Sequence, residues 1–315
     1  MEMINILCTP DNNYVPYCGI MLTSLFENNK GVDFEVYIMC EGLDGKNIAD
    51  FEKLSEFYNV PINILTVNKE LFKKCPVRPG DHISIAAYFR LIAPEMLPKH
   101  INKVLYIDCD IIVNASIEEF YAFNIDKNAF GAVIDEAFFN NEKYERLCYD
   151  KRYSHINSGV LLLNLDYWRE NKIADKCLEY ISKYPERVKF HDQDTLNAVL
   201  HNEMKLLPIK YNLQTGFLLT DYAKNYKNEM PEILEAAKSP VIIHFTGVSK
   251  PWFKGSRHPY RKRFLHYKNI SLWKAHPLKK NRYSLYERII RLRNEIIWAL
   301  GIMKRPESYI IEEQA

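Results

Sequence analysis

Short apolar runs of strand length recur along most of the chain. They are rich in Ile, Val and Leu and occupy residues 4–8, 34–40, 62–67, 104–107, 132–134, 160–165 and 241–245. Between several of these runs the apolar positions follow helical spacing, at residues 17–27, 47–58, 86–96 and 168–184. This alternation of strand and helix patterns predicts βαβ units and an α/β fold built on a mostly parallel sheet.

The strand patterns are continuously apolar, which is typical of a sheet whose two faces are both covered by helices. In open sheets of this kind, ligands bind outside the carboxyl ends of the strands. Polar residues directly after a strand are therefore the first candidates for chemistry. Three segments meet that description, at residues 9–14, 108–110 and 244–250.

The composition changes near residue 249, where basic and aromatic residues, among them Trp273 and Trp298, accumulate. From there to the end the chain carries sixteen Lys or Arg against five Asp or Glu, although its overall net charge is only +2. Apolar positions then follow helical spacing at Leu285, Ile289, Leu292, Ile296, Leu300 and Met303. This pattern predicts a basic amphipathic helix that meets an anionic membrane surface. A core-packed C-terminal helix or an oligomer contact is the alternative.

With 315 residues and 47% hydrophobic content, the chain is long enough for a large globular domain. No basic region precedes the first apolar run, and no run is long enough to span a bilayer. The seven cysteines are scattered and form no C-x-x-C pair, which argues against a disulfide framework or a zinc site. We therefore expect a cytoplasmic protein whose membrane contact, if it has one, is peripheral. No nucleic-acid recognition module is visible, so nucleic acid is not expected as a partner.

The strongest chemical signal is a D-x-D motif, Asp108-Cys109-Asp110, at the end of the fourth apolar run. In an extended segment, side chains two positions apart point to the same side, so both carboxylates can approach one divalent cation. Beside a diphosphate, such an ion would neutralise the charge on a departing nucleotide. The alternative is a polar strand end that caps a turn.

A second signal is the segment that follows the last apolar run. His244 supplies an imidazole, which is a suitable third ligand for Mn²⁺. Gly247 lets the backbone approach a phosphate, and Lys250 adds a compact positive charge. A lone histidine in this place is more often structural, but the neighbouring glycine and lysine favour the metal interpretation.

These residues belong to a longer set of motifs that resembles the family 8 retaining glycosyltransferases, in particular the bacterial lipopolysaccharide galactosyl- and glucosyltransferases. The resemblance covers roughly residues 3–265 and rests on segments 11–14, 83–91, 106–110, 157–164, 191–194 and 244–252. It implies a glycosyltransferase A type fold, a Rossmann-like domain that binds a nucleotide-diphospho-sugar. It also implies a UDP-hexose donor and a divalent metal, Mn²⁺ or Mg²⁺.

The resemblance assigns roles residue by residue. It implies that the uracil and ribose of the donor are held by Thr9, Asp11, Asn13 and Tyr14. Arg90 would contact the donor sugar or its covering loop, although a structural ion pair is an alternative for this arginine. The metal ligands would be Asp108, Asp110 and His244, and the diphosphate contacts Gly247 and Lys250.

The sugar end of the implied site consists of Asp135, Asn157, Asp192 and Gln193, since carboxylates and amides read ring hydroxyls by hydrogen bonds. Asp192 has a helix N-cap as its alternative role, and Asn157 a turn before a strand. Gln193 lies near the anomeric carbon in the family. Because an amide is a poor nucleophile, same-face attack assisted by the leaving phosphate is the expected route to retention.

We therefore expect a retaining hexosyltransferase that moves galactose or glucose from a UDP-sugar to a glycan or glycolipid acceptor. The expected domains are a transferase domain at residues 1–265 and a helical basic extension at residues 266–315. A sugar-phosphate nucleotidyltransferase would carry a Gly-rich loop near its N-terminus, which this chain lacks. A non-catalytic UDP-sugar-binding or membrane-associated scaffold of the same fold is the remaining alternative.

Overall fold

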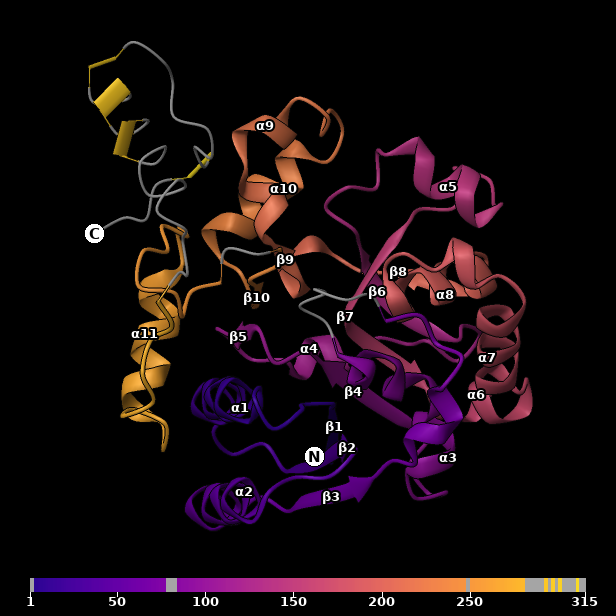
Figure 1. The fold of residues 1–315 in the computed structure, drawn as a ribbon, viewed down its shortest axis with the longest axis horizontal. Helices are drawn as coiled ribbons and strands as arrows, with labels where there is room; N and C mark the ends of the chain where they lie inside the picture. Colours follow the sequence, from indigo (N-terminus) through magenta and orange to yellow (C-terminus); the bar gives the residue numbers. More distant parts are fainter. Residues whose placement is uncertain are drawn as a thin grey trace.

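The computed structural model describes residues 3–77, 84–247 and 250–280, and the pairs 292–293, 296–297, 300–301 and 310–311. Within this part of the chain, seven strands form a central sheet in the order β3-β2-β1-β4-β7-β6-β8, and three form a small sheet in the order β5-β10-β9 (Figure 1). The strands are β1 (Ile4–Cys8), β2 (Phe34–Cys40), β3 (Ile62–Thr66), β4 (Lys103–Ile107), β5 (Ile111–Val113), β6 (Phe130–Ile134), β7 (Ile156–Asn164), β8 (Met204–Leu206), β9 (Leu213–Gln214) and β10 (Ile242–His244).

All seven predicted apolar runs are strands, but the sheet is mixed. Strands β3, β2, β1 and β4 run parallel, whereas β7 is antiparallel to both of its neighbours, β4 and β6. The chain passes from β6 to β7 through the single short helix between them. It does not cross over the sheet to start again at the same edge, so β7 runs in the opposite direction to β6. The last predicted strand, β10, lies in the small sheet.

The helices cover both sides of the central sheet. The α-helices are α1 (Val15–Asn28), α2 (Gly45–Tyr58), α3 (Ala93–Met96), α4 (Glu118–Tyr121), α5 (Asn141–Leu147), α6 (Leu165–Glu170), α7 (Ile173–Lys183), α8 (His191–Leu200), α9 (Thr220–Ala223), α10 (Met230–Lys238) and α11 (Arg261–Ile270). Short 3₁₀ helices are η1 (Lys69–Phe72), η2 (Ile85–Ile92), η3 (Pro185–Arg187), η4 (Ile209–Tyr211) and η5 (Thr215–Leu218).

Two predicted helices are interrupted. The segment expected at residues 86–96 begins as the 3₁₀ helix η2, and α3 starts a new helix with proline in its first turn. The segment expected at 168–184 is divided into α6 and α7 at Lys172, whose backbone is left-handed with φ 51°. A left-handed residue cannot continue an α-helix, so the direction of the chain changes there.

The central sheet separates two apolar cores. In β1, Ile6 joins the core that contains α1 and α2, whereas Leu7 joins the core that contains η2, α6 and α7. Neighbouring residues of β7 divide in the same way, with Leu162 in the first core and Leu161 in the second. Both faces are therefore dry, which explains why the strands are continuously apolar.

The region after residue 250 packs on the α/β domain at α1. Helix α11 lies against α1 (Figure 1) and runs through residue 265, the expected domain boundary. Trp273 is buried, and a Cβ at Gly19 of α1 would lie 2.0 Å from its ring. The expectation that Trp273 belongs to a membrane-facing tail is therefore wrong, because its ring fills the space that Gly19 leaves.

The predicted amphipathic helix lies mostly outside the described residues. Three of its apolar positions are described, and Leu292, Ile296 and Leu300 are each more than half exposed. Among the described residues, no helix combines the length and the apolar character needed to cross a membrane.

Candidate functional site

The D-x-D motif forms the turn between β4 and β5, not an extended segment as expected. Strand β5 pairs antiparallel with β10, and this register sets His244 opposite Ile111. The backbone N–H of Phe245 donates to the carbonyl of Asp110 at 3.0 Å. A three-residue strand thus carries the histidine to the carboxylates from 134 positions further along the chain.

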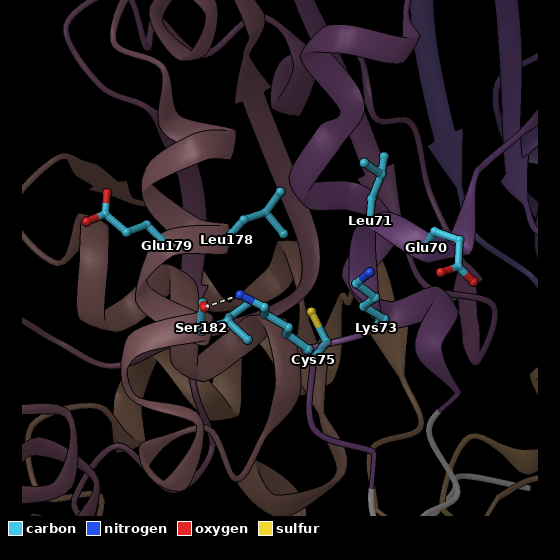
Figure 2. Close-up of a pocket in the computed structure, with 9 residues that line it drawn as sticks. Glu70, Leu71, Lys73, Cys75, Leu178, Glu179 and Ser182 are labelled. Carbon is cyan, nitrogen blue, oxygen red and sulfur yellow. Dashed lines mark hydrogen bonds between the residues drawn. The ribbon is translucent and has the colours of Figure 1, made fainter.

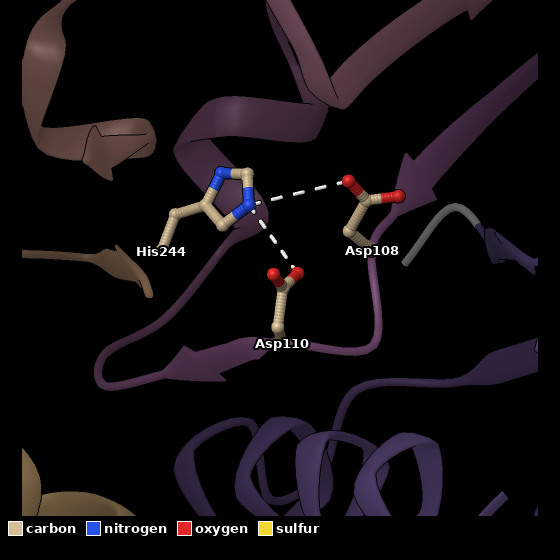
Figure 3. A group of neighbouring side chains, drawn as sticks. All are labelled: Asp108, Asp110 and His244. Carbon is tan, nitrogen blue, oxygen red and sulfur yellow. Dashed lines mark ion pairs between the residues drawn. The ribbon is translucent and has the colours of Figure 1, made fainter. Parts of the chain in front are cut away.

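Asp108, Asp110 and His244 point toward one another (Figure 3) and form the Asp-Asp-His cluster. Each offers one ligand atom, and these atoms lie within 4.8 Å of one another. His244 Nε2 is 3.3 Å from Asp110 Oδ1 and 4.0 Å from Asp108 Oδ2. Two hard oxygen donors and one imidazole are a donor set that suits Mn²⁺ and related divalent ions.

Gly159 leaves room for the side chains of this cluster. A Cβ there would lie 2.2 Å from His244 Cε1 and 2.8 Å from Asp108 Oδ2. The Asn157-Ser158-Gly159 motif lies inside β7, so its alternative as a simple turn before the strand is wrong. The glycine in this motif is required by the ligand side chains rather than by a bend of the chain.

A buried amide fixes the orientation of His244. His244 Nδ1 lies 2.9 Å from Asn212 Oδ1, and because an amide oxygen only accepts, Nδ1 carries the proton and Nε2 faces the carboxylates. Such outer partners set the tautomer of metal-binding histidines. Asn212 also donates to Asn157 Oδ1 at 2.9 Å. Sequence reasoning missed Asn212, because no motif surrounds it.

Lys250 supplies a positive charge to the cluster. Its ammonium group lies 2.5 Å from Asp110 Oδ2 and donates to the carbonyl of Phe245 at 2.7 Å. Burial alone would raise the pKa of Asp110, but Lys250 and His244 outweigh burial and hold it well below its usual range. Gly247 has φ +73°, a left-handed conformation that favours glycine. The two residues between Gly247 and Lys250 lie outside the described part of the chain.

Arg90 links the Asp-Asp-His cluster to a third carboxylate, that of Asp192. Its guanidinium is buried and lies 3.0 Å from Asp108 Oδ1 and 3.2 Å from Asp192 Oδ2. It also lies over the ring of Tyr106, whose hydroxyl donates to Asp108 Oδ1 at 2.5 Å. In this structure Arg90 thus forms ion pairs, as its alternative role predicted. Both of its partners, Asp108 and Asp192, are candidate site residues.

Asp192 lies within the first turn of α8 and is not its N-cap, which is Phe190. The N-cap alternative is therefore wrong. Burial raises the pKa of Asp192 to about 6, although Arg90 opposes the shift. Its Oδ2 is buried without a hydrogen-bond donor among the described residues, because Arg90 Nε donates to the carbonyl of Ala87. Because buried oxygen atoms normally accept a hydrogen bond, the open position at Oδ2 suits the hydroxyl of a ligand.

Asp135, Asn157 and Gln193 form a hydrogen-bonded group, the amide-carboxylate cluster. Gln193 Oε1 accepts from Asn157 Nδ2 at 3.1 Å and from the backbone N–H of Ser158 at 3.2 Å. Its Nε2 donates to Asp135 Oδ2 at 3.1 Å and lies 3.4 Å from His155 Nε2. The backbone donor fixes which end of the Gln193 amide is the oxygen.

Two buried basic residues behind this cluster were missed. Lys143 of α5 forms an ion pair with Asp135, and His155 contacts Gln193. Burial lowers the pKa of His155 to about 4, so its ring is neutral at pH 7. Neither residue belongs to a motif, and a lysine on a short helix is most often a surface residue.

The expected nucleotide loop borders a cavity of about 500 Å³. The lining residues are Pro10, Asp11, Asn12, Asn13, Glu41, Gly42, Ser84, Ile85, Ala86 and Phe89. Thr9 and Tyr14 do not line it: Thr9 Oγ1 lies 3.0 Å from the hydroxyl of Tyr106, and the Tyr14 ring packs edge-on against Trp252. Thr9 still connects this loop, through Tyr106, to Asp108.

A smaller cavity of about 340 Å³ lies between η1 and α7 (Figure 2). Its lining residues are Glu70, Leu71, Lys73, Lys74, Cys75, Leu178, Glu179, Ile181 and Ser182. Lys74 donates to Ser182 Oγ across it at 3.2 Å. None of the predicted site residues lines this cavity, and its residues suggest no chemistry.

Comparisons with known proteins agree with this geometry. The family model "Glycosyl transferase family 8" matches residues 5–255. A lipopolysaccharide 1,2-glucosyltransferase of Escherichia coli is 31% identical over 283 residues, which are 89% of this chain and 82% of that protein. General stress protein A of Bacillus subtilis is 28% identical, over 86% of this chain and 95% of its own length. A lipopolysaccharide 1,3-galactosyltransferase of Salmonella typhimurium is 26% identical, over 86% and 80%.

Solved structures support the fold. The galactosyltransferase LgtC, crystallised with donor and acceptor sugar analogs, superposes with a TM-score of 0.76 at 24% identity and covers 85% of this chain and 96% of its own. The architecture is therefore the glycosyltransferase A type, as the resemblance to family 8 implied. Since the family model spans most of the sequence and one relative exceeds 30% identity over most of both chains, this protein belongs to glycosyl transferase family 8.

Proposed function

We propose that the protein is a retaining hexosyltransferase that moves galactose or glucose from a UDP-sugar to a glycan or glycolipid acceptor. One observation carries the proposal: hydrogen bonds connect the Asp-Asp-His cluster on both sides. Toward the cavity at Asp11 the connection runs through Tyr106 and Thr9, and toward the amide-carboxylate cluster it runs through Asn212. A nucleotide, a diphosphate and a sugar form a substrate with the same three parts in the same order.

The middle part of the site fits a divalent metal and a diphosphate. Asp108, Asp110 and His244 would hold the ion, and Gly159 leaves room for the His244 ring beside Asp108. When bound there, a divalent cation such as Mn²⁺ or Mg²⁺ supplies positive charge that offsets the charge developing on the departing UDP. Lys250 would move from Asp110 to a phosphate oxygen, and the left-handed backbone at Gly247 allows the close approach that this contact needs.

The nucleotide and sugar ends follow from this placement. Asp11 and Asn13 border the cavity that would receive the uridine. Asp135, Asn157, Asp192 and Gln193 would read the hydroxyls of the hexose. Asp192 Oδ2 supports this role, because it forms an ion pair with Arg90 but accepts no hydrogen bond among the described residues. Arg90 would hold Asp108 and Asp192 in place through its two ion pairs, and we do not assign it a direct contact with the sugar.

Retention of configuration would proceed by attack on the same face as the leaving group. Both ends of the Gln193 amide are already engaged, with Ser158 and Asn157 at the oxygen and Asp135 at the nitrogen. A neutral amide held in this way is a weak nucleophile. We therefore assign Gln193 to positioning the anomeric carbon and assign uptake of the acceptor proton to the leaving diphosphate.

The acceptor is proposed to be a saccharide, and a lipid-linked one fits the tail. Relatives named as lipopolysaccharide glucosyl- and galactosyltransferases support this class. The basic amphipathic segment, with exposed Leu292, Ile296 and Leu300, would bring the enzyme to an anionic leaflet at the cytoplasmic face. The donor hexose, galactose or glucose, is left to experiment.

The first test is UDP release from a panel of UDP-sugars without acceptor, with Mn²⁺, with Mg²⁺ and with chelator. Mass spectrometry would identify the fate of the sugar. Slow metal-dependent hydrolysis of one UDP-hexose is expected, and it names the donor. If no UDP-sugar is bound or turned over, the alternative of a non-catalytic scaffold replaces the transferase. The intact Asp-Asp-His cluster counts against that alternative, because a non-catalytic protein has no need to retain all three ligands.

A further inference from the structure

Lys143 is a buried lysine behind the amide-carboxylate cluster, and no motif of the sequence includes it. It lies in α5 with 5% of its surface exposed, and Asp135 is equally buried. The two side chains form an ion pair. Burial of Asp135 alone would raise its pKa, but the net shift is downward, chiefly because of the charge of Lys143, with hydrogen bonds from Lys143 and from the backbone N–H of Ala137. Asp135 therefore stays ionised in an environment that would otherwise favour its neutral form.

The two oxygens of Asp135 face different partners. Oδ1 accepts from Lys143 and from the backbone N–H of Ala137 at 3.0 Å, on the side away from Gln193. Oδ2 accepts from Gln193 at 3.1 Å and from Asn157 at a long 3.5 Å. Lys143 thus occupies one oxygen and leaves the other directed at the site. The long contact to Asn157 is the weakest, so a substrate hydroxyl can replace it.

Helix α5 is itself fixed to the helix that carries Gln193. One turn after Lys143, Arg146 donates to both oxygens of Asp194, at 2.6 and 3.3 Å. Asp194 is fully buried and accepts the backbone N–H groups of Lys189 and Phe190, each at 2.7 Å. These bonds tie α5 to the first turn of α8. Lys143 is therefore presented by a rigid element rather than by a loop.

We propose that Lys143 is a positioning residue that determines how Asp135 reads a hydroxyl of the transferred hexose; this rests on the proposed function. Lys143 keeps Asp135 ionised and holds its Oδ1, so that Oδ2 accepts the hydroxyl in one orientation. Without the ammonium group, the buried carboxylate takes up a proton. A protonated carboxyl group offers a donor where an acceptor is needed.

The test compares Lys143→Met, which keeps the length of the chain but removes its charge, with Lys143→Arg, which keeps the charge. Lys189→Met is the matched control, because Lys189 forms an exposed ion pair with Glu142, a residue of the helix α5 that also carries Lys143. The measurement is kcat and KM for metal-dependent hydrolysis of the UDP-hexose donor and of analogues that each lack one hydroxyl. Affinity for UDP alone is measured in parallel.

For Lys143→Met we expect kcat/KM on the complete donor to fall about 10- to 100-fold, the range seen when outer partners of functional ligands are removed. The loss should disappear on the one deoxy donor that lacks the hydroxyl read by Asp135. Lys143→Arg should recover part of the activity. Lys189→Met and the affinity for UDP should stay unchanged.

An equal loss on every donor, or no loss in a folded Lys143→Met variant, overturns the proposal. If Lys143→Met does not fold, the double variant Asp135→Asn, Lys143→Met removes the buried charge together with its partner. This variant should no longer distinguish the complete donor from that deoxy donor, and retained discrimination also overturns the proposal. The proposed function fails separately, when the wild-type protein hydrolyses no UDP-hexose at all.

Discussion

The two ends of the site differ in how their charges are balanced. In the Asp-Asp-His cluster the side chains of Asp108 and Asp110 are 27% and 15% exposed, and Lys250 forms an ion pair with Asp110 that a phosphate would replace under the proposed function. Around the amide-carboxylate cluster, Asp135 and Asp194 are almost completely buried, and Lys143 and Arg146 are built into the fold as their partners. Under the proposed function, a metal and a substrate would complete the Asp-Asp-His end, here called the ligand-completed end. The fold itself supplies the partners at the other end, here called the protein-completed end.

The largest effect is expected from breaking the ligand-completed end. Asp110→Asn keeps the shape of the side chain but removes the charge that binds a cation. Metal-dependent turnover should fall by at least about 100-fold, as for loss of a main electrostatic stabiliser of a transition state. The variant should still fold, but its melting temperature should fall somewhat, because Lys250 and His244 lose a carboxylate that they stabilise in the folded protein. Kinetics at saturating Mn²⁺ and a thermal melt test this; undiminished turnover would refute the metal assignment.

The second prediction concerns Lys250, the exchangeable partner. Lys250→Met should bind Mn²⁺ alone more tightly, because the ammonium group no longer competes for Asp110 Oδ2. It should bind UDP more weakly, because a phosphate contact is lost. Calorimetric titration with Mn²⁺ and with UDP measures both. If the two affinities change in the same direction, Lys250 is a fixed structural partner, and the contrast between the two ends is lost.

The strands of the central sheet and the Asp-Asp-His cluster were predictable from the sequence, because both depend on continuous apolar runs. Strands β1 and β2 begin and end at the predicted residues, because both faces of the sheet are dry and the apolar runs are continuous. The Asp-Asp-His cluster was also identified, since its ligands come directly after apolar runs. Binding of the basic tail to an anionic membrane was predicted from its charge pattern and stays a prediction.

What escaped prediction depends on tertiary contacts. Strand β5 has three residues, too few for a periodic signal, yet it pairs with β10 and brings His244 to the carboxylates. Asn212 and Lys143 are ordinary polar residues in the sequence, and their roles arise from the groups they meet after folding. The ligand-completed end was therefore visible in the sequence, whereas the supports of the protein-completed end were not.

A smaller effect is expected when the pH is lowered, and it concerns the protein-completed end. His155 is neutral in the folded protein, because burial lowers its pKa from 6.5 to about 4. The unfolded chain binds a proton near pH 6.5 and the folded chain does not, so the contribution of His155 to stability is complete above pH 6.5 and falls below it. Asp192, whose pKa is raised to about 6, contributes in the opposite direction below that pH. The loss is about 1.4 kcal/mol per pH unit for one such histidine.

Unfolding by urea at pH 7.5, 6.5 and 5.5 checks this slope. His258, buried with its pKa lowered to about 3, adds a second contribution in the same direction. The variant His155→Gln should show a shallower decrease than the wild-type protein. His100→Gln changes an exposed histidine and should keep the wild-type slope. Equal slopes in all three proteins would mean that His155 is not held neutral by the fold.

The smallest effect on the chemistry itself is expected from removing the tail. Trp273 packs on Gly19, so a deletion that starts at the expected boundary of residue 265 would expose the core; the cut has to follow Lys280. The cut also removes Ile310 and Ile311, which pack on the first core, and the hydrogen bond from the Ile310 N–H to the carbonyl of Leu218. The shortened protein should lose some stability but still hydrolyse UDP-hexose at close to the wild-type rate, because every candidate site residue precedes the cut. Its binding to vesicles containing anionic lipid should weaken, and the difference should shrink in high salt, because the charge attraction is screened. Unchanged vesicle binding would assign the tail to packing or to self-association.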